Sequence, residues 1–140
     1  NKPVVGMTSL GSSCLKYMKL IKPALENRGF EVAIFHATGM GGMAYESIAR
    51  DGGFACVMDF ALPELGNLLA GSVINAGEDR MMNAGASAIP QIIAPGCLDL
   101  IDFENIQPGF RTLMHEPVQY NEVIQACHLA CLMQAGLPSF

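Results

Sequence analysis

Up to about residue 100 the chain repeats one unit, in which an apolar run of strand length leads into a turn and then into a helical stretch. The strand-like runs fall at residues 3–11 with their turn, 30–37, 54–60 and 90–94. Strands separated by helices need crossover connections, which are right-handed and give a parallel sheet. The pattern therefore predicts an α/β fold: an open, mostly parallel sheet with helices on both faces, a flavodoxin-like or Rossmann-like three-layer sandwich.

Start and stop signals define the helices between these strands. Ser12 or Ser13 is expected to cap a first helix that ends near Asn27. Further helices are expected at residues 42–50, 64–70, 78–88 and 121–135.

Size and composition favour one domain. The chain has 140 residues, of which 51% are hydrophobic and 15% charged, and domains most often have roughly 100–150 residues. Residues 1–140 are therefore interpreted as a single α/β domain, with a divergent tail at residues 104–140 that ends in a helix. Because the chain opens directly on a strand without an initiator Met, we expect an excised domain or a processed fragment rather than a whole gene product.

Charge and hydropathy argue against two classes of binding partner, nucleic acids and membranes. The net charge of −5 and the absence of a basic stripe argue against nucleic-acid binding, which needs clustered Lys and Arg. The apolar stretches end well short of the ~20 residues that span a bilayer, and the first residues have no signal-peptide layout. We therefore expect a cytoplasmic protein without membrane contact, whose apolar excess lies under helices or against another domain or subunit.

The cysteines do not indicate a metal or disulfide framework. Five cysteines are an odd number without framework spacing, so free thiols are expected. Cys127, His128 and Cys131 share a predicted helix, but a structural zinc site needs about four ligands and no second pair is present.

The most informative segment is EVAIFHATGMGGMAYESIAR, residues 31–50, where a strand leads into a glycine turn and a helix. Gly39, Gly41 and Gly42 let the backbone approach a ligand closely, and the helix start presents unpaired N–H groups to an anion. The turn is not a P-loop, because it lacks the Gly-Lys-Ser/Thr ending. A phosphate or carboxylate site is predicted here.

In an open parallel sheet, ligands bind beyond the carboxyl ends of the strands. The polar and glycine positions expected at this edge are Thr8, Ser9, Gly11, Ser12, Ser13, His36, Thr38, Gly39, Gly41, Gly42, Asp59, Gly96 and Asp99. The hydroxyl-rich loop of residues 8–13 is expected either to bind phosphate or simply to cap its helix. Asp59 is expected to bind ligand hydroxyls or a metal, or to cap the following turn.

An enzymatic alternative uses the same edge. His36 stands at a strand end with Glu46 in the next helix, so it could act as an acid or base with Glu46 or Asp59 as partner. This reading predicts a small-molecule hydrolase or lyase; the alternative role of His36 is a hydrogen bond to a ligand or to the fold.

A second glycine turn precedes Glu78, Asp79 and Arg80. Arg80 is expected either to contact an anionic ligand or to pair with an acidic neighbour, the usual fate of a helix arginine.

Three segments carry a family resemblance: KPVVGMTSLGSS, GFEVAIFHATGMGGMAYESIARDG and LAGSVINAGEDRMMNAGASAIPQIIAPGCLDLIDF. Together they resemble the Tm-one-like ATP-binding domain family, which includes the tomato virus resistance protein and many bacterial proteins. The similarity covers residues 2–103 and matches the second of that family's paired α/β domains. After Phe103 the chain departs from the expected His-Asn element, near which His115 stands.

The resemblance implies a nucleotide-binding or regulatory domain that binds ATP, with Mg²⁺ as a possible companion. It further implies a preceding sister domain and a homo-oligomer. The motif positions that it carries over are Thr38, Gly39, Gly41, Gly42, Gly77, Asp79, Arg80, Gly96 and Asp99.

Overall fold

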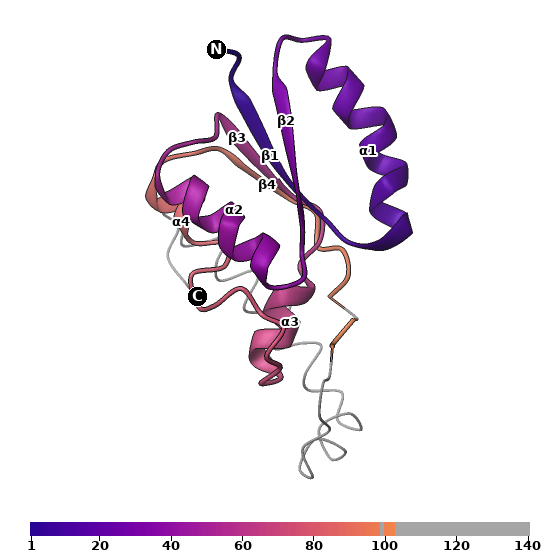
Figure 1. Ribbon diagram of the computed structural model, residues 1–140, viewed down its shortest axis with the longest axis vertical. Helices are drawn as coiled ribbons and strands as arrows, with labels where there is room; N and C mark the ends of the chain where they lie inside the picture. The colour runs from indigo at the N-terminus through magenta and orange to yellow at the C-terminus, as the bar shows by residue number, and fades with distance from the viewer. Residues whose placement is uncertain (99, 103–140) are drawn as a thin grey trace, which may run out of the picture.

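The computed structural model describes residues 1–98 and 100–102 (Figure 1). In chain order the elements are β1 (Val4–Ser9), α1 (Gly11–Glu26), β2 (Glu31–His36), α2 (Met40–Arg50), β3 (Cys56–Asp59), α3 (Pro63–Leu69), α4 (Asn83–Ala86) and β4 (Gln91–Ile93). Asp99, the predicted tail at residues 104–140 with its helix at 121–135, and the group Cys127, His128 and Cys131 lie outside the described residues.

The four strands form one sheet in the order β2-β1-β3-β4, and every neighbouring pair is parallel. Ser9 pairs with His36, and Thr8 pairs with Asp59, so the carboxyl ends of β1, β2 and β3 meet at one edge. Helices α1 and α2 lie on opposite sides of the sheet (Figure 1). The predicted open, parallel α/β fold is confirmed.

The core on the α2 side is aromatic. Phe35 of β2 meets Tyr45 of α2 edge-on, with the ring centroids 5.5 Å apart, and Phe54 packs against both rings. A Cβ at Gly6 would lie 2.9 Å from the Phe54 ring, so β1 needs glycine where the ring crosses it. Because alternate side chains of a strand point to opposite faces, His36 points away from this core and from α2.

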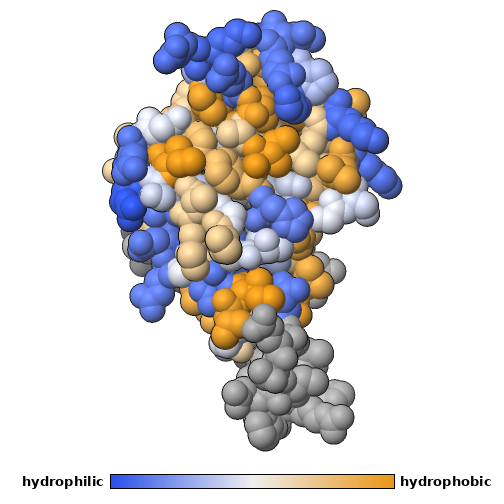
Figure 2. All heavy atoms as spheres, in the orientation of Figure 1, coloured by the Kyte–Doolittle hydropathy of each residue, from blue (hydrophilic) through white to orange (hydrophobic). Residues whose placement is uncertain are grey.

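Several apolar side chains remain exposed. Leu15, Tyr17 and Leu20 of α1 and Met40 and Met43 of α2 are exposed large side chains. Apolar residues cover much of the middle of the face shown in Figure 2, while hydrophilic residues gather along its upper rim. Part of the apolar excess in the composition therefore lies on the surface. None of the helices in the described ranges has the length and apolar character needed to cross a membrane.

Two local predictions are wrong. The predicted helix at residues 78–88 is reduced to turns followed by α4, because Met81 and Ala88 have φ angles of 73° and 54°, which a right-handed helix does not allow. The predicted Ser12 or Ser13 cap is replaced by Leu10, which makes no side-chain capping bond, and both serines lie inside α1.

Candidate functional site

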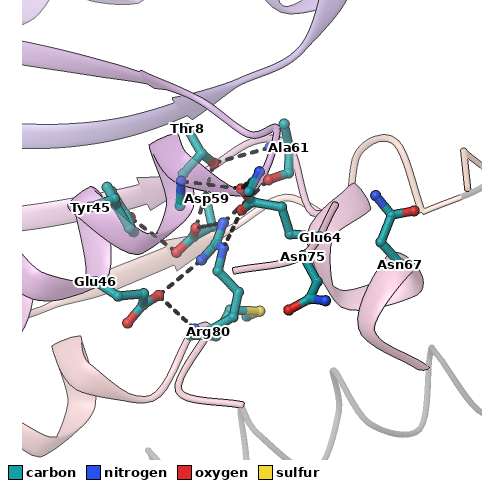
Figure 3. A network of polar contacts seen from close by, with 12 residues as sticks. Thr8, Tyr45, Glu46, Asp59, Ala61, Glu64, Asn67, Asn75 and Arg80 are labelled. Carbon is teal, nitrogen blue, oxygen red and sulfur yellow. Dashed lines mark hydrogen bonds and ion pairs between the residues drawn. The ribbon is translucent and has the colours of Figure 1, made fainter. Parts of the chain in front are cut away.

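A buried arginine lies at the centre of three carboxylates (Figure 3). Arg80 is 2% exposed, and its three guanidinium nitrogens each contact a different acid. Nη1 lies 3.1 Å from Glu46 Oε1, Nη2 lies 2.7 Å from Asp59 Oδ1, and Nε lies 2.9 Å from Glu64 Oε2. The planar guanidinium thus ties α2, β3 and α3 to the turn that precedes α4.

Asp59 is committed to the protein interior. Its Oδ2 accepts hydrogen bonds from the Tyr45 hydroxyl at 3.1 Å and from Gln91 Nε2 at 2.7 Å. Thr8 Oγ1 lies 3.5 Å from Asp59 Oδ1 and accepts hydrogen bonds from the amides of Phe60 and Ala61. Thr8 and Asp59 are both 0% exposed, so in this structure neither reaches a ligand as the sequence predicted.

The glycine turn already holds an anion, and that anion belongs to the chain. Glu64 Oε1 accepts hydrogen bonds from the amides of Gly39 at 2.7 Å and Gly42 at 3.1 Å, at the start of α2. A Cβ at Gly42 would overlap the Glu64 carboxylate, so a larger residue there would displace that side chain from the amides. The amides predicted to bind a ligand anion are therefore taken up by an internal carboxylate. Gly41 is also a packing glycine, because its Cβ would overlap the carbonyl oxygen of His36.

Burial and charge shift the pKa values within the cluster. Burial raises the pKa of Tyr45, and the adjacent Asp59 raises it further. Burial opposes the charge on Arg80, but Asp59, Glu64 and Glu46 together raise its pKa above the ordinary value. Arg80 therefore stays charged, and it is outnumbered by acids. Burial also raises the pKa of Glu46, against the hydrogen bond from the Met81 amide and the charge of Arg80.

Replacing Glu46 by glutamine is expected to change how stability depends on pH. The folded protein binds more protons than the unfolded chain between pH 4.5, the ordinary value, and the raised pKa of Glu46. The free energy of unfolding of the wild type should therefore fall relative to Glu46→Gln as pH rises through that window. Urea denaturation of both proteins at a series of pH values measures the difference. A wild type that gains stability relative to Glu46→Gln over the same window would contradict the assignment.

The structure does not assemble the predicted acid–base pair. His36 Nδ1 lies 3.2 Å from Thr38 Oγ1 at an exposed position. Glu46 is directed at Arg80, at the Met81 amide and at Asn83, on the α2 side of the sheet. His36 points to the other side, so neither Glu46 nor Asp59 serves as its partner.

The residues predicted around the second glycine turn are partly buried and partly exposed. Arg80 has the predicted acidic neighbours, whereas Asp79 is exposed and, with Glu46, Arg50 and Asn83, lines a polar pocket of about 150 Å³. Gly77 has a φ of 84° in the turn that leads to Arg80. Gly96 packs against the residue that follows β3, since a Cβ there would overlap the Phe60 carbonyl, and its own carbonyl accepts a hydrogen bond from the Leu62 amide.

An exposed rim remains at the carboxyl ends of β1 and β2. Gly11 and Ser12 at the start of α1 are exposed, as are His36 and Thr38 after β2. Ser9 is buried at 5% exposure, and the side chain of Ser13 lies outside the described set. No group of three or more His, Cys, Asp or Glu side chains within the described ranges is arranged to hold a metal.

Sequence reasoning missed Glu64, Tyr45 and Gln91. Glu64 follows Pro63 in the first turn of α3, where an acidic residue ordinarily serves the helix dipole. Nothing in the local sequence distinguishes this surface role from the buried one, because the amide of Gly39 is 25 residues away.

Comparison with known proteins gives consistent matches. The model of a family described as "Uncharacterised protein family (UPF0261) C-terminal domain" matches residues 2–128. A UPF0261 protein of Brucella melitensis is 58% identical over 113 residues, which are 79% of this chain and 27% of that protein. A UPF0261 protein of Clostridium tetani is 42% identical over 106 residues, which are 76% of this chain and 26% of that protein.

The tomato relative that the resemblance implied is also found. The ToMV resistance protein Tm-1 of Solanum lycopersicum is 31% identical over 113 residues, which are 79% of this chain and 15% of that protein. The chain thus spans about a quarter or less of the length of these curated relatives. The family model and the bacterial and tomato relatives agree, so the chain belongs to the UPF0261 C-terminal domain family.

Proposed function

We propose that this domain binds a small anionic ligand, with ATP or another nucleotide as the favoured class, without performing chemistry on it. The binding groups are those of the exposed rim: the start of α1, with Gly11 and Ser12, and the end of β2, with His36 and Thr38. The observation that carries the proposal is that α1, a helix of 16 residues, begins at this rim without a side-chain cap and without an acidic residue in its first turn.

The physical reason is the set of backbone groups at the start of α1. The first N–H groups of a helix have no intrahelical partner, and the helix dipole favours negative charge beside them. Gly11 has a φ of 62°, and among the described residues no atom beyond its chain neighbours and its own helix backbone lies within 4 Å of the position of a Cβ there, which supports space for an anion. This start is therefore available to a ligand, in contrast to the start of α2, where Glu64 fills the same role.

The end of β2 adds polar side chains to the same rim. Ser9 and His36 are paired across β1 and β2, so the chain that enters α1 and the loop after His36 leave the sheet side by side. The imidazole of His36 and the hydroxyl of Thr38 are exposed and 3.2 Å apart. Both can bond to phosphate or ribose oxygens. With the acids facing the other side of the sheet, these groups support binding rather than proton transfer.

The proposal also covers the assembly, the location and the metal companion of the longer protein. A preceding sister domain and a homo-oligomer are proposed from the family resemblance, a cytoplasmic location is proposed from the apolar pattern of the sequence, and Mg²⁺ is proposed as the companion of ATP. The exposed apolar side chains of α1, including Leu20 at 75% exposure, support contact with another domain or subunit.

Ser12→Glu is the sharpest test of the rim. A carboxylate in the first turn should leave α1 intact or stabilise it by about 0.3–1 kcal/mol, while repelling a ligand anion. Thermal shift with ATP, with and without Mg²⁺, should show a rise in melting temperature for the wild type and a much smaller rise for Ser12→Glu.

Ala55→Glu is the matched control. It adds the same charge at an exposed position before β3, at the opposite edge of the sheet, and should respond to ATP like the wild type. Equal responses from all three proteins would place the ligand elsewhere, and no response at millimolar ATP, with the sister domain present, would remove the nucleotide proposal.

A further inference from the structure

The start of α2 has the composition of a carboxylate receptor. The amides of Gly39 and Gly42 both donate to one oxygen of Glu64, at 2.7 and 3.1 Å, and Arg80 Nε donates to the other oxygen at 2.9 Å. Three donors, one of them charged, therefore converge on a single planar anion. Hydrogen bonds to an ionised acceptor are stronger than neutral ones, and a helix N-terminus adds favourable potential.

The receptor part of this arrangement does not depend on Glu64 for its shape. Gly39 has a φ of 86° and Gly42 belongs to α2, so backbone conformation aims both amides. Arg80 is fixed independently by Glu46 and Asp59. The occupant, by contrast, comes from α3, a separate helix of 7 residues.

We propose that Gly39, Gly42 and Arg80 form a second anion site, specific for carboxylates, which Glu64 fills as an intramolecular ligand. An external carboxylate and Glu64 exclude each other, because Glu64 is 0% exposed and both of its oxygens are bonded. The site goes beyond the proposed rim, which lies at the start of a different helix. Its consequence is that α3 acts as a plug: only when the Glu64 carboxylate is withdrawn does the glycine turn accept a ligand.

Chemical rescue tests the site directly. In Glu64→Ala, acetate or formate at constant ionic strength should raise the melting temperature in a saturable way and shift the NMR amide signals of Gly39 and Gly42. In Glu64→Gln the neutral amide fills the same volume and blocks acetate, so the saturable rise in melting temperature should be lost. Wild type should not respond.

Asn67→Ala is the control for general effects of acetate on weakened proteins. Asn67 is buried on the same helix, and its side chain hydrogen-bonds to Ile74 and Asp102 rather than to the amides of Gly39 and Gly42. This variant should lose stability and gain nothing from acetate. Phosphate, which is tetrahedral, should rescue Glu64→Ala less well than acetate.

Three results would overturn the proposal. The first is that acetate leaves the melting temperature and the two glycine signals of Glu64→Ala unchanged, or that this variant stays unfolded at every acetate concentration. The second is an equal rise in Glu64→Gln or Asn67→Ala. The third is stronger rescue by phosphate, which would remove the carboxylate specificity. None of these results bears on ATP binding at the rim, which the Ser12→Glu comparison tests separately.

Discussion

Replacing Arg80 by methionine is expected to reduce the free energy of unfolding by about 3–5 kcal/mol at neutral pH, the cost of leaving buried charges without a partner. Arg80 is the shared counterion of Glu46, Asp59 and Glu64. Methionine fills much of the volume but neutralises none of the three acids. The loss should shrink as pH is lowered, because burial raises the pKa of Glu46 and the loss of the Arg80 charge raises it further, so that this carboxylate takes up a proton in the variant first. Urea denaturation at several pH values measures both effects.

Arg50→Met is the matched control for this substitution. The Arg50 side chain makes exposed contacts, with the Asp51 carboxylate at 3.9 Å and with the Ser47 hydroxyl at 3.2 Å, and exposed ion pairs contribute about 0–1 kcal/mol. The free energy of unfolding of this control should therefore stay close to that of the wild type. An Arg80→Met protein that is as stable as Arg50→Met would mean that the buried cluster does not hold α2, β3 and α3 together.

Replacing Gly41 by alanine is expected to cost about 1–3 kcal/mol, as overpacking of a filled site usually does. The added methyl would overlap the carbonyl oxygen of His36, a backbone atom that cannot rotate away. The turn between β2 and α2 must then shift, so the amide signals of Gly39 and Gly42 should move as well. Thermal denaturation and amide chemical shifts together report the change.

Gly66→Ala provides the comparison within a helix. The nearest atom to a Cβ at Gly66 is 3.7 Å away, an ordinary contact, and alanine is favoured over glycine in a helix by up to about 1 kcal/mol. This variant should equal or exceed the wild type in stability. If both alanine variants behave alike, the close approach of Gly41 to His36 is not a constraint on the fold.

The sheet could be predicted because its signal is local. Apolar runs of strand length separated by helices require a parallel arrangement, and the observed strands fall inside the predicted runs. The helix at residues 78–88 could not be excluded in this way. The left-handed conformation of Met81 accompanies the placement of Arg80 among acids from three other elements, and that demand comes from tertiary packing.

The anion bound by the glycine turn could not be identified from local sequence either. The sequence predicted that amides at the start of α2 would bind a ligand anion, whereas in the structure they bind the carboxylate of Glu64. Glu64 reaches Gly39 across 25 positions, and only the packing of α3 brings it there. His36 failed as a catalytic partner for a related reason, because strand alternation turns it away from Glu46 and Asp59.

The most direct test of the account is an NMR titration of the wild-type chain with ATP. Binding at the proposed rim should shift the amide signals of Gly11, Ser12 and Thr38 in a saturable way, while the signals of Gly39 and Gly42 stay in place because Glu64 holds those amides. Shifts centred on Gly39 and Gly42, with Gly11 and Ser12 unaffected, would contradict the account.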